Sequence, residues 1–395
     1  MPRTLRGATA VALASGRPVV DRPSGARTRR TPRVLPTEQR LRRRTQLSHG
    51  LVWLAAAQGD PYAALLRGLD TDPRPYWRLL SEERLSRSAT GAWVTARHAV
   101  ARQVAAEPAL RALPPVEGVD APASGTGASE AAHHVEEGWE RALASAAREP
   151  DLVTLARDGA LGTLSRAWGL DSAGERTLRV AVELTGAALD DPFYPQSLAA
   201  TRGIAEGVAA LRSLPEMGRR GEELLAAAGV PMVTSLVVNT LTPHPSADRR
   251  PDLPGLWDQL RAEPGRAASA VRETLRWAGP VQLHATVADA ACDLAGRRIE
   301  EGEQVVVALG AANRDPGVFT HPDRYDPDRP ADELSAVLPP GLEWSPVVAF
   351  AVAVAEEGLR RLTAGGGGAA PAGPVVRRAA APVSWAPAVR LSETI

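Results

Sequence analysis

The chain has 395 residues, enough for one large domain or two ordinary ones, and its 46 basic and 46 acidic residues leave no net charge. Balanced charge gives no general attraction to nucleic acid, and no apolar run approaches the roughly 18 residues that span a bilayer. A single cysteine excludes a disulfide framework and suits a reducing compartment, so we expect a cytoplasmic protein.

The first segment, residues 1–45, is rich in arginine. It holds twelve arginines against two acidic residues, with scattered proline and glycine and little apolar periodicity. Such a composition buries too little apolar surface to fold alone. We therefore expect a disordered segment over residues 1–45, followed by a single domain over residues 46–395. An arginine-rich arm could contact nucleic acid or a membrane, but a disordered tail or part of a partner contact is favoured.

Residues 47–107 have the pattern of a globular protein. Apolar helical spacing is followed by two short strand-like runs around Gly91, and a helix is expected over residues 99–107. Residues 151–188 and 197–211 carry apolar side chains at the spacing of amphipathic core helices. The sequence therefore predicts a mainly α-helical chain with small β-sheets, in the α+β class.

Two histidines and two glutamates fall close together in a helical run. They are His133, His134, Glu136 and Glu137. Adjacent residues on a helix point about 100° apart and do not converge on one ion, so a solvated polar face is favoured over a metal site.

A near-continuous apolar stretch runs from Gly221 to Leu241 and predicts a long buried helix. Pro231 lies within this stretch and is expected to kink the helix, because proline removes a backbone donor. Two hydroxyl residues follow, Thr234 and Ser235, and hydroxyls inside a helix most often bond back to a backbone carbonyl.

The stretch from Val271 to Pro330 carries the most specific motifs. Glu273 and Arg276 are three residues apart, a spacing that puts both side chains on one face of a helix. Two short strand-like runs follow, separated by Gly296. An Ala-Asn-Arg-Asp-Pro segment then occupies residues 312–316, and Tyr-Asp-Pro-Asp-Arg ends at Arg329.

In this order the motifs resemble the K helix, small β-sheet and meander of the cytochrome P-450 superfamily, with Tyr325 where the family has phenylalanine. The resemblance covers about residues 47–395 and implies the P-450 fold. It also implies a buried network of Glu273, Arg276 and Arg329. A buried charge costs several kcal/mol unless it is paired, and two arginine forks can satisfy one carboxylate.

Two further segments narrow the resemblance. Gly-Asp-Pro-Tyr at residues 59–62 and Thr-Gly-Ala-Trp-Val at residues 90–94 are similar to a branch of heme-free P-450 homologues. Members of that branch assist the glycosyltransferases that attach deoxysugars to macrolides and anthracyclines.

The residue that would bind heme iron is missing from its expected place. In heme-binding members a Phe-Gly-x-Gly loop with a cysteine thiolate follows the meander. Here residues 330–346 contain no cysteine, phenylalanine or histidine, and an apolar helix is expected from Val347 to Leu362. The only cysteine, Cys292, comes some fifty residues too early. Because the thiolate gives this heme its oxygen chemistry, the resemblance implies a P-450 fold without the cysteine-ligand loop, without heme and without monooxygenase activity.

Other cofactor positions are altered as well. In oxygen-activating members of the family, a glycine on this helix precedes an acid and a threonine that relay protons. When Gly229 is aligned with that glycine, the acid and the threonine are replaced by Pro231 and Met232, and neither side chain transfers a proton. The arginine that binds a heme propionate in the family corresponds to His284. Trp139 and Arg141 lie near the place of the helix that supplies other propionate contacts.

The resemblance therefore implies a protein with no catalytic residue, cofactor or metal, which binds, stabilises and activates a partner nucleotide-deoxysugar glycosyltransferase as a hetero-oligomer. It implies no nucleic-acid or membrane partner. Two alternatives remain open. One is a heme-dependent monooxygenase with unusual ligation by His284 or Cys292. The other is a heme-free recruitment module of another pathway, such as one that docks on a peptide synthetase.

Overall fold

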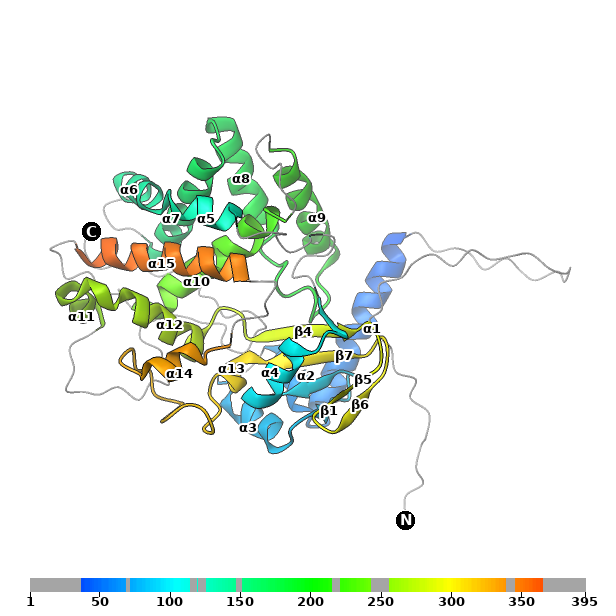
Figure 1. Cartoon of the computed structure of the whole chain (residues 1–395). Helices are drawn as coiled ribbons and strands as arrows, with labels where there is room; N and C mark the ends of the chain where they lie inside the picture. The colour runs from blue at the N-terminus through cyan, green and yellow to red at the C-terminus, as the bar shows by residue number, and fades with distance from the viewer. Residues whose placement is uncertain are drawn as a thin grey trace, which may run out of the picture.

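The structure, a computed structural model, describes residues 37–364 apart from seven short segments (Figure 1). Those segments are residues 69–71, 114–118, 120–125, 147–150, 215–220, 243–255 and 339–344. Residues 1–36, most of the segment predicted to be disordered, lie outside the described residues. So do residues 339–344, which are part of the stretch expected to lack the cysteine-ligand loop.

A mixed five-stranded sheet forms the lower part of the molecule in Figure 1, in the order β1-β2-β7-β4-β3. Strands β2 and β7 are parallel and the other neighbours are antiparallel. A separate antiparallel pair, β5 and β6, turns at Gly296, whose φ of 81° favours glycine. The strands are β1 (Ser86–Arg87), β2 (Trp93–Thr95), β3 (Leu110–Ala112), β4 (Leu283–Ala288), β5 (Cys292–Leu294), β6 (Arg297–Ile299) and β7 (Gln304–Ala308).

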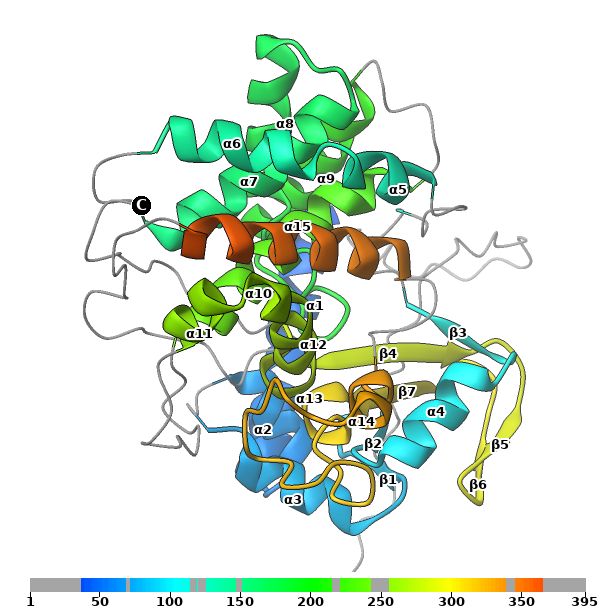
Figure 2. The same cartoon turned by 60° about the vertical axis from the view of Figure 1, so that its left-hand side comes forward.

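Helices make up most of the remaining described chain, which confirms the predicted mainly α-helical fold with small sheets. Figure 2 shows α15 crossing the molecule between α6 and α7 on one side and α10 and α12 on the other. The helices are α1 (Thr37–Ala57), α2 (Pro61–Arg67), α3 (Arg74–Glu82), α4 (His98–Ala106), α5 (Thr126–Ala132), α6 (Val135–Ala144), α7 (Leu152–Ala167), α8 (Ser172–Leu184), α9 (Leu198–Arg212), α10 (Val230–Leu241), α11 (Leu256–Ala262), α12 (Ala267–Ala278), α13 (Leu309–Ala312), α14 (Ala331–Ser335) and α15 (Ser345–Ala364).

Several helices begin where a side chain caps the first backbone N–H groups. Asp60 accepts a hydrogen bond from the Ala63 amide at 2.8 Å, and Asp151 accepts one from the Thr154 amide at 3.0 Å. Asp171 and Ser197 cap α8 and α9 in the same way. These caps satisfy donors that have no partner inside the helix, so the helix starts follow from local sequence.

Helix α1 runs through the domain boundary that the sequence analysis places after residue 45. Residues 37–45, assigned there to a disordered segment, form the first half of this helix. Arginine, glutamine and leucine are good helix formers, and the apolar second half of α1 packs on the body through Val52 and Ala55. Composition alone therefore underestimated the order of this segment, because a helix anchored at one end extends past its anchor.

The long apolar helix contains a π-helical turn, Leu225–Gly229 (η1), followed by the regular helix α10. Pro231 is the second residue of α10 and has no N–H to donate to the preceding turn. Thr234 donates its hydroxyl to the Val230 carbonyl at 2.9 Å, as predicted for a hydroxyl residue inside a helix.

The buried apolar side chains form three clusters. The largest lies among the helices and includes side chains of η1, α10 and α15. The second joins α1 and α2 to one face of the sheet, and the third joins α4 and β5 to the opposite face. Strand β7 is apolar on both faces, because Val306 faces the second cluster and Val305 and Val307 face the third. In the part of the chain that the structure describes, none of the helices is apolar enough over sufficient length to cross a bilayer.

Candidate functional site

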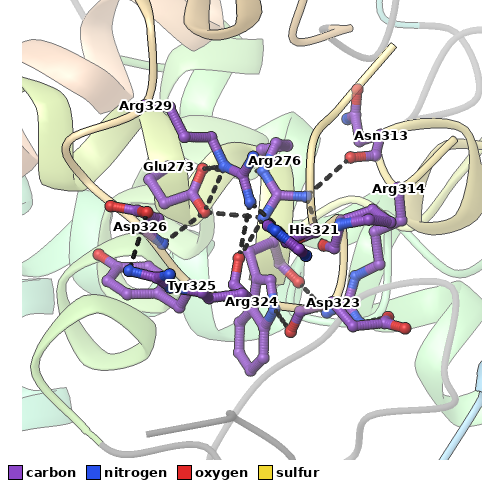
Figure 3. Close-up of polar contacts among 12 residues, drawn as sticks. Glu273, Arg276, Asn313, Arg314, His321, Asp323, Arg324, Tyr325, Asp326 and Arg329 are labelled. Carbon is purple, nitrogen blue, oxygen red and sulfur yellow. Dashed lines mark hydrogen bonds and ion pairs between the residues drawn. The ribbon is translucent and has the colours of Figure 1, made fainter. Parts of the chain in front are cut away.

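The predicted triad of Glu273, Arg276 and Arg329 forms a buried ion-pair network (Figure 3). Arg276 donates to both carboxylate oxygens of Glu273 at 2.7 and 2.8 Å. The Nε atom of Arg329 donates to the same two oxygens at 3.1 Å. Glu273 is 0% exposed, so its charge depends on these partners for stabilisation. The structure thus brings together all three residues that the sequence singles out.

The two guanidinium groups also bind the loop that follows α13. Arg276 directs its remaining N–H groups to the carbonyls of Asn313, Pro322 and Arg324, at 3.1, 2.7 and 2.9 Å. Arg329 binds the carbonyls of Thr320, His321 and Arg324, at 2.6, 3.0 and 2.8 Å. All five N–H groups of each arginine therefore have acceptors, and the network fastens the loop to α12.

Glu333 is a fourth member that sequence reasoning missed. It accepts from the NH1 group of Arg329 at 2.7 Å and from the Thr320 amide and hydroxyl at 3.1 and 2.7 Å. Burial alone would raise the pKa of Glu333, but the hydrogen bonds from Thr320 and Arg329 outweigh it and lower the pKa. With Glu333 the buried group holds two carboxylates and two guanidiniums, so its charges balance. The only signal in the sequence was a glutamate four residues after Arg329.

We expect Glu333→Gln to lower the free energy of unfolding by about 1–3 kcal/mol, because Arg329 loses a charged acceptor. The contribution of Glu333 is present above its unfolded pKa of about 4.3 and is lost as the pH falls through its lower folded pKa. Urea unfolding at several pH values tests this. The difference from the wild type should shrink in acid, whereas Asp332→Asn, at an exposed neighbouring carboxylate, should change little at any pH.

The tyrosine that stands in place of the family's phenylalanine is fitted into the same network. The Tyr325 hydroxyl donates to the Ala270 carbonyl at 3.0 Å and lies 3.1 Å from the Thr274 hydroxyl. Burial raises the pKa of Tyr325, so it remains a neutral donor. The substitution therefore adds a hydrogen bond to α12 and leaves no polar group unpaired.

Arg314, from the Ala-Asn-Arg-Asp-Pro segment, is also buried. Its guanidinium lies 4.9 Å from the ring centre of Trp77 and 4.7 Å from that of Trp277, and it donates to the Trp277 carbonyl. Burial and, secondarily, the charge of Arg276 lower the pKa of Arg314 to about 10, so it stays charged at neutral pH. The neighbouring Asn313 bonds to both the carbonyl and the amide of Leu338, at 3.1 and 2.7 Å. These motif residues hold the loop in place and present no open site.

The oxygen-activation positions lie in a closed, apolar contact between η1, α10 and α15. A Cβ atom added to Gly229 would lie 2.8 Å from the Phe350 ring and 3.7 Å from Val347, so the two helices touch at this glycine. Met232, in the position of the relay threonine, is 1% exposed. A heme against this part of η1 and α10 would need an open slot between them and α15, and the Phe350 ring packs on Gly229 there. The residues present therefore do not fit heme.

Neither candidate for unusual iron ligation is brought to this contact. Cys292 lies in β5 within the third apolar cluster, whereas Gly229 and Phe350 belong to the helical region around the first cluster. Burial raises the pKa of the Cys292 thiol, which keeps it from forming a thiolate at neutral pH. His284 is buried in β4, where it pairs in register with Val307. These placements do not support the monooxygenase alternative.

The predicted propionate position does not keep the charge of the family's arginine. Burial lowers the pKa of His284 to about 4, so its imidazole is neutral at neutral pH and offers a propionate no positive charge. Trp139 is also not available to bind a propionate, since its indole N–H donates to the Val354 carbonyl at 2.8 Å. Arg141 forms an ion pair with Glu175 at the surface.

Trp139 is a packing residue whose role the sequence did not reveal. It is 0% exposed and its ring lies against two glycines on separate helices. A Cβ atom at Gly159 of α7 would lie 2.8 Å from the ring, and one at Gly358 of α15 would lie 2.1 Å from it. The two glycines make room for the indole, which joins α6, α7 and α15.

Comparison with known proteins places this architecture in one family. A model described as "Cytochrome P450" matches residues 267–341, the stretch that contains the network. The chain is 34% identical to Protein DesVIII of Streptomyces venezuelae, over 86% of this chain and 90% of the relative. It is 36% identical to Cytochrome P450 family protein EryCII of Saccharopolyspora erythraea, over 87% of this chain and 95% of the relative.

Solved structures agree on the fold. The structure of epothilone B-bound cytochrome P450epoK is similar with a TM-score of 0.64 at 17% identity, and the match covers 82% of this chain and 97% of that one. At this identity the likeness shows the fold alone. The relatives and the family model confirm the resemblance predicted from the sequence, both to the superfamily and to its branch of P-450-like auxiliary proteins. The chain belongs to the cytochrome P450 family.

Proposed function

We propose that the chain is a non-catalytic auxiliary protein that binds, stabilises and activates a nucleotide-deoxysugar glycosyltransferase in antibiotic biosynthesis. The observation that carries the proposal is the packing of Phe350 on Gly229, which leaves no open slot for a heme at this contact. The network around Glu273 is complete, so the scaffold is kept while the groups that serve iron and oxygen are not. A fold retained in this way acts through its surface.

The proposed mechanism is thermodynamic linkage. The nucleotide sugar and the aglycone would bind the glycosyltransferase, and this chain would supply no catalytic group. A partner that binds only the folded, active form of an enzyme raises the population of that form. The gain is about 2.7 kcal/mol when the free partner is at a hundred times its Kd. The proposal implies a hetero-oligomer that forms in the cytoplasm.

Co-expression tests the proposal. A nucleotide-deoxysugar glycosyltransferase from the same organism is produced with and without the chain, and its soluble yield and initial rate of deoxysugar transfer are measured. We expect both to rise with the chain and to saturate as its concentration increases. A heme-binding P-450 of similar size, added instead, controls for non-specific stabilisation by any folded protein.

An unchanged transfer rate and an unchanged soluble yield would contradict the proposal. If the chain instead bound a carrier domain of a peptide synthetase, the recruitment alternative would replace it. The comparison separates the two functions because only the first alters the behaviour of a glycosyltransferase.

A further inference from the structure

One face of α1 presents large apolar side chains to the surface. Leu47, Leu51 and Leu54 are 70%, 50% and 56% exposed. They are separated by four and three residues, a spacing that aligns them along one side of a helix. Arg43, also exposed, lies four residues before Leu47 and continues the same line toward the start of α1. These four residues are called the α1 stripe below.

The opposite side of α1 is fixed to the body of the protein. Val52 and Ala55 are buried in the second apolar cluster. The His49 ring stacks on Tyr194 with ring centres 4.3 Å apart, and its Nε2 atom lies 2.7 Å from the Pro195 carbonyl. Figure 1 shows α1 at the edge of the molecule, with its upper turns clear of the other helices. The helix therefore cannot rotate its leucines into the core, and they form a preformed surface.

The charge of α1 restricts what can cover the stripe. Residues 37–57, the span of α1, contain four arginines and one acidic residue, Glu38, so the helix has an excess of three positive charges. If two copies of this chain paired through α1, both helices would bring the same excess of positive charge and would repel each other. A partner that matches the stripe therefore brings acidic side chains of its own.

A membrane surface also matches the stripe poorly. A helix that lies in a lipid interface keeps its charged residues on the side opposite its apolar residues. In α1 the exposed Arg43 is in line with the exposed leucines, so immersing the leucines would carry Arg43 toward the acyl chains. A groove in a protein, apolar along most of its length and acidic at one end, fits this arrangement. Helices commonly dock in such grooves through residues spaced by three and four.

We propose that the α1 stripe docks in an apolar groove of the partner glycosyltransferase, and that acidic side chains at one end of the groove receive Arg43. The inference rests on the proposed function and adds the surface that performs it. Leu47, Leu51 and Leu54 supply the buried area and hence most of the affinity. The charge of Arg43 and its neighbours sets the direction of the helix in the groove and speeds association.

Binding of the full chain to the glycosyltransferase used in the co-expression test, measured by isothermal titration calorimetry, tests the inference. We expect Leu51→Glu to weaken binding about tenfold to a hundredfold, since a leucine that is buried on binding is replaced by a charge in the apolar part of the groove. Val180→Glu is the matched control. Val180 is 52% exposed on α8, and this variant should bind as the wild type does. Arg43→Glu should weaken binding less and make it less sensitive to salt.

The outcomes distinguish a wrong docking surface from a wrong proposed function. If the wild type and Leu51→Glu bind the glycosyltransferase equally, the docking surface is wrong and the proposed function stands. If the wild type does not bind it, both are wrong. Two results would overturn the inference if Leu51→Glu still binds the glycosyltransferase as the wild type does. If the wild type binds phosphatidylglycerol vesicles and Leu51→Glu does not, the α1 stripe binds a membrane. If the wild type forms a dimer in light scattering and Leu51→Glu does not, the α1 stripe binds a second copy of the chain. Equal melting temperatures of the variants show that each is folded.

Discussion

Replacing Glu273 by glutamine is expected to lower the free energy of unfolding by about 3–5 kcal/mol. The substitution keeps the shape of the side chain but removes the charge that both Arg276 and Arg329 bind. Two buried guanidiniums would then share one carboxylate, Glu333, and one positive charge would remain uncompensated. Because a domain of this kind is stable by only about 5–15 kcal/mol, the loss is a large fraction of the total.

Urea unfolding followed by circular dichroism measures this effect, and Glu263→Gln is the matched control. Glu263 lies 3.8 Å from Arg266 in an ion pair whose glutamate side chain is 68% exposed. Such a surface pair contributes about 0–1 kcal/mol. Recovery of Glu273→Gln only from insoluble material would be the extreme form of the expected result. Equal losses in the two variants would show that the buried network does not stabilise the fold.

The second large effect concerns Phe350. Phe350→Ala should lower the free energy of unfolding by about 3–5 kcal/mol, because it leaves a cavity in the contact between η1 and α15. Gly229→Ala should cost about 1–3 kcal/mol, since its new methyl group would lie 2.8 Å from the Phe350 ring. In the Phe350→Ala background the same methyl group meets open space, so Gly229→Ala should then cost much less.

The double-mutant cycle isolates this contact, because two residues that touch have non-additive effects. Phe193→Ala, at a half-buried phenylalanine in the turn between α8 and α9, is a control that should be additive with Gly229→Ala. Additive losses for Gly229→Ala and Phe350→Ala would mean that the two helices do not meet at this point, and that the heme slot is open.

The network was predictable because its members are marked by short, ordered motifs. Glu273 and Arg276 are three residues apart on one helix, and Arg329 ends a recognisable Tyr-Asp-Pro-Asp-Arg segment, so their meeting follows from the resemblance. Glu333 has no such motif, and its role depends on how the loop folds back after Arg329. Charge balance is a property of the folded group that spacing alone does not reveal.

The closed heme slot could be predicted only in part. The altered residues at positions 231 and 232 and the missing cysteine were visible in the sequence. The contact between Gly229 and Phe350 was not, because it joins residues more than a hundred positions apart through packing. The same holds for Trp139, whose fit depends on two glycines of different helices. The ordered start of α1 was missed because composition does not record that the second half of the helix is anchored.

The absorption spectrum of the purified chain, incubated with excess hemin, reduced and exposed to carbon monoxide, tests the central claim most directly. Packing of Phe350 on Gly229 and the absence of a cysteine in the sequence after Arg329 predict only the spectrum of free hemin, with no porphyrin retained after gel filtration. One equivalent of retained heme with a red-shifted carbon-monoxide band would contradict the account, since it would require both an open slot and a thiolate ligand.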